Sequence, residues 1–268
     1  KDGDNYNSKI PDTEKGHLKK IILSNLWDKM PHLYAENIKD YNDELISGRY
    51  FFRSCMEDLF NPDKILVLGN KGTGKSYIYR SLREKSIVNA LQKRANKTSL
   101  NCQFIHIIDD CKRIDTIKFD NIEGTNDFFF ERFWTVYIWN AIMLDVPYGY
   151  ISSLKVVPIL DDIKTASRFK KIISSDEEMI KIENDLRNLN LYLSEKNSKI
   201  IIIFDELDSI VKPHMWSERI SPLINICRRM KYDSISPKLF LRSDLYEKIS
   251  NLNNINELTN RTISIEWN

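Results

Sequence analysis

The stretch of sequence that decides the fold is KILVLGNKGTGKS, residues 64–76, in which a short apolar run meets a glycine-rich loop. The apolar run at 64–68 predicts a buried β-strand, and residues 77–82 after the loop predict a helix. The loop itself, residues 69–76, matches the pattern G-x-x-x-x-G-K-S/T and holds three of the eight glycines in the chain. The sequence therefore predicts a strand, a tight loop and a helix in immediate succession.

A loop of this kind binds phosphate groups. Its glycines let backbone N–H groups approach an anion because no Cβ intervenes, and the helix that follows presents further N–H groups. Lys75 is predicted to reach the β- and γ-phosphates of a nucleotide, and the hydroxyl of Ser76 to bind Mg²⁺. The alternative, a glycine-rich turn without a ligand, leaves the Lys-Ser pair without a role. The predicted nucleotide contacts are Gly69, Asn70, Lys71, Gly72, Thr73, Gly74, Lys75, Ser76 and Tyr77.

The second informative stretch is KIIIIFDE, residues 199–206, a continuous apolar run that ends in two acidic residues. Such a run is typical of a central parallel strand buried on both faces. Ligands of open α/β sheets bind beyond the carboxyl ends of the strands, so we expect Asp205 to hold Mg²⁺ opposite Ser76. We expect Glu206 to act as the general base that deprotonates an attacking water.

Helix capping is the competing interpretation for these acidic residues. Asp205 and Glu206 could simply begin the next helix, although their position downstream of the phosphate-binding loop favours a functional role. For Asp208 the preference between these two interpretations is reversed. Capping is the preferred interpretation, and a contact with the metal or with a neighbouring subunit is the alternative.

Phosphoryl transfer also needs a cation that stabilises the charge on the transferred group. Arg242 is the best-placed candidate because it ends the predicted fourth strand, residues 238–242. Arg219, Arg228 and Arg229 are alternatives, acting within one chain or across a subunit interface. For each of the four arginines, a surface salt bridge is the competing interpretation.

The remaining elements indicate an α/β fold. Further strands are predicted at 103–108 and 262–267, and strands alternate with helices along the chain. This alternation predicts a five-stranded, mainly parallel sheet flanked by helices. Residues 1–60 are predicted to form an N-terminal helical lead-in, and residues 61–268 the main domain. A helical insertion is expected at about 123–197. The predicted helices outside the loop region include 18–30, 34–46, 125–144 and 176–195.

Composition gives little guidance on partners. The net charge of +2, from 40 basic and 38 acidic residues, gives no general attraction to nucleic acid or to an anionic membrane. The four cysteines and four histidines lack metal-ligand or disulfide spacing, which indicates reduced thiols and no structural metal. No apolar run is long enough to span a membrane, so a cytoplasmic protein is expected.

Together these motifs resemble the additional-strand, catalytic-glutamate class of P-loop ATPases, which includes the AAA+, STAND and KAP groups. The closer resemblance is to ATPases of bacterial conflict and antiphage defence systems. It is carried by residues 66–76, 204–208 and 239–245, and it covers roughly residues 50–267. The resemblance implies the strand order 5-1-4-3-2, ATP and Mg²⁺ as ligands, self-association, and control of an effector protein such as a nuclease.

Two missing motifs narrow the class. The chain has no Leu-Ser-Gly-Gly-Gln signature, which argues against transporter and chromosome-cohesion ATPases, and no Asn-Lys-x-Asp guanine reader, which favours ATP over GTP. The leading hypothesis is an ATP-hydrolysing regulatory or assembly subunit in antiphage defence. A nucleic-acid-dependent ATPase, such as a loader or translocase, and a nucleotide-gated scaffold with little turnover are the alternatives.

Overall fold

The structure is a computed structural model that describes residues 21, 52–108, 127–145, 171–249 and 255–266. The chain divides into two compact units, residues 1–42 and 43–268. Of the first unit only Ile21 is described, and it is helical. Apart from this residue, the helices predicted at 18–30 and 34–46 lie outside the described part of the chain.

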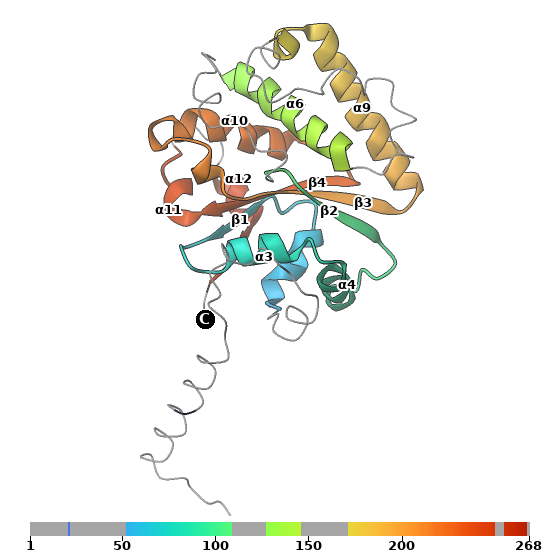
Figure 1. Ribbon diagram of the computed structural model, residues 1–268, viewed down its shortest axis with the longest axis vertical. Helices are drawn as coiled ribbons and strands as arrows, with labels where there is room; N and C mark the ends of the chain where they lie inside the picture. Colours follow the sequence, from blue (N-terminus) through green and yellow to red (C-terminus); the bar gives the residue numbers. More distant parts are fainter. Residues whose placement is uncertain (1–20, 22–51, 109–126, 146–170, 250–254, 267–268) are drawn as a thin grey trace, which may run out of the picture. The chain divides into compact units, whose positions relative to one another are not determined.

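A parallel sheet forms the centre of the second unit (Figure 1). Each neighbouring pair of its five strands runs parallel, which confirms the predicted α/β architecture. Within the described residues the strands lie in the order β2-β3-β4-β1-β5, which reads 5-1-4-3-2 from the other edge. Their bounds are β1 (Leu66–Gly69), β2 (Asn101–His106), β3 (Ser198–Phe204), β4 (Ile235–Arg242) and β5 (Thr262–Ser264).

Helices cover both faces of this sheet, as Figure 1 shows. One face carries α6 (Asp127–Asp145), α9 (Asp176–Glu195) and α10 (Trp216–Arg229), and the other carries η2 (Ser54–Phe60), α3 (Lys75–Ser81) and α4 (Lys85–Arg94). Double coverage explains why residues 200–204 of β3 are all apolar and all buried. The shorter elements are η4 (Leu207–Ser209), η5 (Pro213–Met215), α11 (Ser243–Tyr246) and α12 (Ile255–Asn260).

The aromatic helix α6 supplies much of the core on one face of the sheet. Trp134, Tyr137 and Trp139 are among the largest fully buried side chains of the described residues. The indole Nε1 of Trp134 donates a hydrogen bond to the backbone oxygen of Arg219 at 2.7 Å, which ties α6 to α10. Its ring also meets the ring of Phe204 edge-on, with centroids 6.3 Å apart. The helix therefore fixes the end of β3, directly before Asp205.

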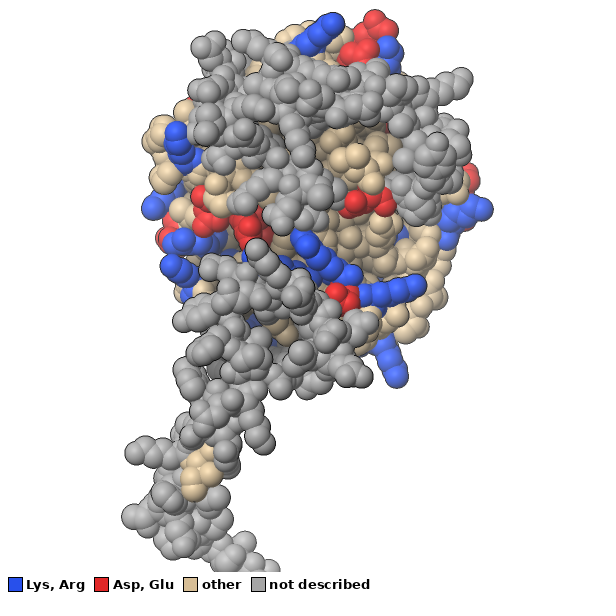
Figure 2. Space-filling view, in the orientation of Figure 1, with Lys and Arg blue, Asp and Glu red and all other residues tan. Residues whose placement is uncertain are grey.

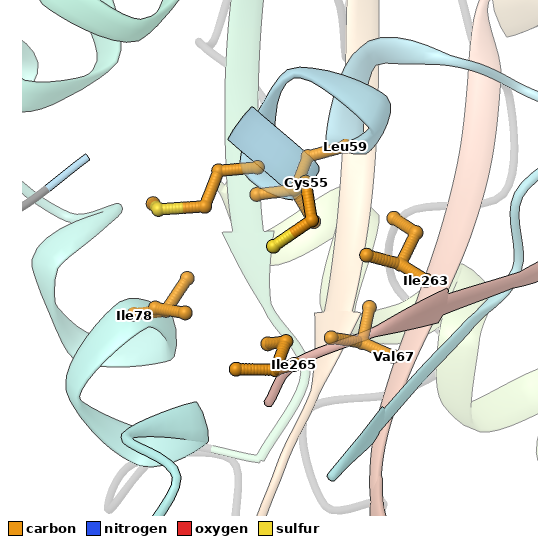
Figure 3. A pocket seen from close by; sticks show the side chains of 7 residues that line it. Cys55, Leu59, Val67, Ile78, Ile263 and Ile265 are labelled. Atoms are coloured by element: carbon orange, nitrogen blue, oxygen red, sulfur yellow. The ribbon is translucent and has the colours of Figure 1, made fainter. Parts of the chain in front are cut away.

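On the opposite face, apolar side chains around a small hollow hold α3 against the sheet (Figure 3). Side chains from η2, α3, β1 and the β5 segment converge on it, and it leaves no space for a water-sized molecule. Its lining residues are Cys55, Met56, Leu59, Val67, Ile78, Ile263 and Ile265. This hollow is a packing contact that holds the loop-bearing helix against the sheet, and it is too small to be a ligand site.

Two further expectations concern thiols and membranes. The described cysteines Cys55, Cys102 and Cys227 are free thiols, and Cys111 lies outside the described residues. Among the described helices, none combines the length and the apolar character that crossing a bilayer requires.

Candidate functional site

The glycine-rich loop, residues 69–76, joins the carboxyl end of β1 to α3, as predicted. Lys75 is the first residue of α3, and its Nζ donates to the backbone oxygens of Gly69 at 2.7 Å and Asn70 at 2.9 Å. Burial lowers the pKa of Lys75, and the nearby Asp205 carboxylate acts in the opposite direction. The lysine is thus held against its own loop by two carbonyl groups, close to a buried carboxylate.

Two positions in the loop require glycine for identifiable reasons. Gly74 has φ +87° immediately before α3, a conformation that L side chains rarely adopt. At Gly69, a Cβ would lie 2.6 Å from the backbone oxygen of Ile265 and 2.6 Å from Oγ1 of Thr73. Thr73 Oγ1 also donates to the Asn70 oxygen at 3.0 Å, which closes the loop on itself.

Asp205 follows β3 directly and is 5% exposed. Burial raises its pKa to about 6, and a hydrogen bond with the Ser76 side chain acts the other way. The second carboxylate oxygen, Oδ2, is buried and has no hydrogen-bond partner among the described residues. A buried carboxylate oxygen without a partner is costly, and a cation would satisfy it.

The structure therefore brings together the two residues predicted to bind metal, Ser76 and Asp205. A hydroxyl and a carboxylate are hard oxygen donors of the type that Mg²⁺ prefers. Within the described residues, no cluster of three or more His, Cys, Asp or Glu side chains could hold a metal alone. These donors fit Mg²⁺ when substrate phosphates supply further oxygens, since protein sites often hold this ion through one or two carboxylates and phosphate.

Glu206, the predicted general base, is adjacent to Asp205 but already has a partner. Arg80 on α3 donates from NH2 to Oε1 of Glu206 at 2.7 Å. The backbone of Glu206 is left-handed, with φ +57°, which costs about 1 kcal/mol or more for an L-residue. Ser209 stabilises this conformation because its N–H and its hydroxyl both donate to the Glu206 backbone oxygen, at 3.0 and 2.7 Å.

Arg242 ends β4 and lies opposite Gly69 in the sheet register, so it stands beside the loop as predicted. Its guanidinium donates to both carboxylate oxygens of Asp244, at 3.1 and 2.8 Å. Asp208 lies 3.6 Å away on its other side. The capping role predicted for Asp208 is wrong, because the residue lies inside η4, whose N-cap is Glu206. Asp208 instead forms an ion pair with Arg242.

The alternative arginines lie in other surroundings. Arg219 is 3% exposed, and its guanidinium carbon lies 3.7 Å from the ring centroid of Phe130, beneath α6. Arg229 pairs with Glu131 at 2.5 Å, in agreement with the salt-bridge interpretation. Arg228 lies 4.0 Å from a carboxylate oxygen of α12. Arg242 is therefore the best placed of the four for the site.

Two arginines near the site, Arg80 and Arg53, are not predicted from the sequence. Arg80 follows Ser76 by four residues, so both side chains lie on one face of α3, and this spacing is a signal that the sequence contains. Arg53 precedes η2, and its NH2 lies 3.7 Å from where a Cβ on Gly74 would be. No sequence pattern indicates the proximity of Arg53, because it depends on how η2 packs.

No family model matches the chain, and comparisons with curated proteins and with solved structures find no match either. The fold and the geometry of the site therefore carry the functional inference.

Proposed function

We propose that the chain binds ATP at the loop 69–76 and hydrolyses it with Mg²⁺. The observation that carries this proposal is the buried Asp205 carboxylate, which shares a hydrogen bond with Ser76 and keeps one oxygen without a partner in the described chain. The strand order that reads 5-1-4-3-2 supports assignment to the additional-strand, catalytic-glutamate class of P-loop ATPases. This class is the one that the sequence motifs resemble.

The proposed roles follow from the positions of the side chains. Lys75 binds the β- and γ-phosphates, and Ser76 and Asp205 hold the metal. Mg²⁺, when bound, supplies positive charge that offsets charge on the phosphates. Glu206 accepts a proton from the attacking water, and Arg242 stabilises charge on the transferred group. Both of these side chains must leave their present ion pairs to act.

The biological role is inferred from the sequence resemblance alone. On that basis, the chain is a regulatory or assembly subunit that associates with itself or with an effector protein such as a nuclease, in bacterial antiphage defence. Charge offers less support for a nucleic-acid-dependent ATPase. Figure 2 shows basic and acidic side chains interspersed over the described residues of the face in view.

A second candidate, a nucleotide-gated scaffold with little turnover, has one specific observation in its favour. The carboxylate that would activate water is bonded to Arg80. A protein that retained this bond with ATP in place would bind nucleotide and hydrolyse it slowly, because a general base must reach the proton that it abstracts.

Phosphate release and ATP binding by the unaltered chain, Lys75→Ala and Glu206→Gln distinguish these functions. Loss of binding is expected for Lys75→Ala. For Glu206→Gln, we expect unchanged affinity and a fall in phosphate release of about 10²- to 10⁴-fold. Glu183→Gln, an exposed carboxylate on α9, is the matched control and leaves both quantities unchanged.

Three other results would redirect the assignment. Unchanged hydrolysis by Glu206→Gln contradicts the general-base role. Tight ATP binding with little release in the unaltered chain favours the scaffold. Faster release on addition of DNA or RNA favours the nucleic-acid-dependent ATPase, whereas an unchanged rate argues against it.

A further inference from the structure

We infer that Arg80 is a positioning residue that holds Glu206 in a resting position and thereby limits hydrolysis. The inference rests on the proposed function. Arg80 NH2 lies 2.7 Å from Glu206 Oε1, and the two side chains are 20% and 37% exposed. The bond to Oε1 holds the carboxylate beside Arg80, whereas a general base must be within hydrogen-bond reach of the attacking water.

The two acidic residues after β3 are held by two residues on one face of α3. Asp205 shares a hydrogen bond with Ser76, and Glu206 bonds to Arg80, four residues further along. At a rise of about 1.5 Å per residue, the Cα of Arg80 lies about 6 Å further along the helix than that of Ser76. The anchor for Glu206 is therefore one turn more distant from the loop than the anchor for Asp205.

Only the side chain of Glu206 has to move for release. Its backbone oxygen accepts two hydrogen bonds from Ser209, at 3.0 Å from the N–H and 2.7 Å from the hydroxyl. These bonds stay in place when the carboxylate rotates away from Arg80. The backbone of Glu206 is thus fixed, and under this inference rotation of its side chain alone frees the carboxylate to bond a water.

The ion pair is partly buried and includes a charge-assisted hydrogen bond, so its loss has a measurable effect. Interactions of this kind shift an equilibrium by a factor of about 3 to 10. If the bonded position is the inactive one, its removal raises the fraction of molecules with a free Glu206 by this factor. The maximal rate of hydrolysis, kcat, rises accordingly, while ATP affinity is unaffected because Arg80 does not belong to the loop.

The test compares kcat and KM for ATP in the full chain carrying Arg80→Met, Arg80→Lys or Arg83→Met. We expect kcat to rise about 3- to 10-fold for Arg80→Met, with KM changed less than about twofold. Arg80→Lys retains a charged donor and stays near the unaltered rate. Arg83→Met, at an exposed arginine three residues further on, is the matched control and leaves kcat unchanged.

The double variant Arg80→Met with Glu206→Gln separates the mechanism from indirect effects. If Arg80 acts through Glu206, the gain in kcat is absent in this background. A lower or unchanged kcat in Arg80→Met, with ATP binding retained, overturns the inference alone. Failure of the unaltered chain to bind ATP overturns the proposed function itself. If Arg80→Met does not fold, as judged by circular dichroism, Arg80→Gln is held to the same criteria.

Discussion

A buried lysine lies at each end of the strands: Lys75 at their carboxyl ends, here called the carboxyl edge, and Lys238 beside the amino end of β1, here called the amino edge. The two lysines make similar hydrogen bonds in different surroundings. At the carboxyl edge, Lys75 Nζ donates to two carbonyl oxygens of its own loop, at 2.7 and 2.9 Å. At the amino edge, Lys238 Nζ donates to the carbonyl oxygens of Asn61 and Lys64, in the turn that precedes β1. Burial lowers the pKa of both lysines, that of Lys238 to about 7.

The difference lies in the neighbouring groups. At the amino edge, Lys64 Nζ donates to the Asn260 oxygen at 2.9 Å, and Arg261 Nε donates to the Asp63 oxygen at 2.9 Å. The cations there are satisfied by backbone carbonyls. At the carboxyl edge, Asp205 keeps a buried oxygen that has no partner among the described residues. The same lysine interaction thus stabilises the fold at one edge and accompanies an incomplete polar site at the other.

Exchange of each lysine for methionine tests this comparison, and the larger effect is expected at Lys75. Lys75→Met removes a cation from the phosphate-binding loop. We expect ATP affinity to fall about 100-fold or more, corresponding to about 3 kcal/mol. Equilibrium binding of a fluorescent ATP analogue measures this change. Lys238→Met is the matched variant and retains the affinity of the unaltered chain. Equal losses in the two variants contradict the comparison.

For stability, the larger effect is expected at Lys238. Lys238→Met removes a fully buried donor from the partly buried carbonyl oxygens of Asn61 and Lys64, so we expect the free energy of unfolding to fall by about 2–3 kcal/mol. Urea denaturation at pH 7 measures this fall, and Lys93→Met at an exposed position serves as the control. Lys75→Met is expected to change the free energy of unfolding by less than about 1 kcal/mol, since the Asn70 oxygen still accepts two hydrogen bonds from Thr73 and only the Gly69 oxygen loses a donor without such a substitute. A more stable Lys238→Met variant would show that burial of this cation is a net cost.

The change of stability with pH is expected to have opposite signs for the buried groups at the two edges, Asp205 and Lys238. Asp205 has a pKa of about 6 in the folded chain, above its ordinary 3.8, so its contribution is greatest below about pH 4 and is lost as pH rises to about 6. Lys238 has a folded pKa of about 7, below its ordinary 10.5, so stability rises between these values. Without Mg²⁺, Asp205→Asn removes the fall at acidic pH and gains about 1–2 kcal/mol at pH 7. Thermal melting from pH 4 to pH 10 tests how stability changes with pH in both ranges. If the loss of stability between pH 4 and pH 6 persists in Asp205→Asn, another group causes it.

The sequence predicts much of this architecture because its main signals are local. The apolar run before Asp205 is typical of a buried parallel strand, and the helix predicted at 176–195 is observed with the same bounds. The loop also required no tertiary information, since its pattern of glycines with Lys75 and Ser76 is contiguous. The interaction between Ser76 and Asp205 followed from one rule, that parallel strands place their carboxyl ends at a common edge.

The parts that the sequence did not predict depend on contacts between distant segments. Arg80 and Glu206 are 126 positions apart, and their ion pair exists only because α3 packs beside the end of β3. Lys238 interrupts an apolar strand pattern, yet it is fully buried because a turn 174 residues earlier supplies carbonyl groups. Asp208 was expected to cap a helix, and the position of Arg242 determined its actual partner.

The magnesium dependence of ATP binding tests the central claim most directly. Calorimetric titration of ATP into the unaltered chain, with Mg²⁺ and then with a chelator, is compared with the same titrations of Asp205→Asn and of Asp233→Asn, an exposed control. The account predicts tighter binding with Mg²⁺ in the unaltered chain and in the control, and loss of that difference in Asp205→Asn. Absence of ATP binding in the unaltered chain, or a magnesium effect that persists in Asp205→Asn, would contradict it.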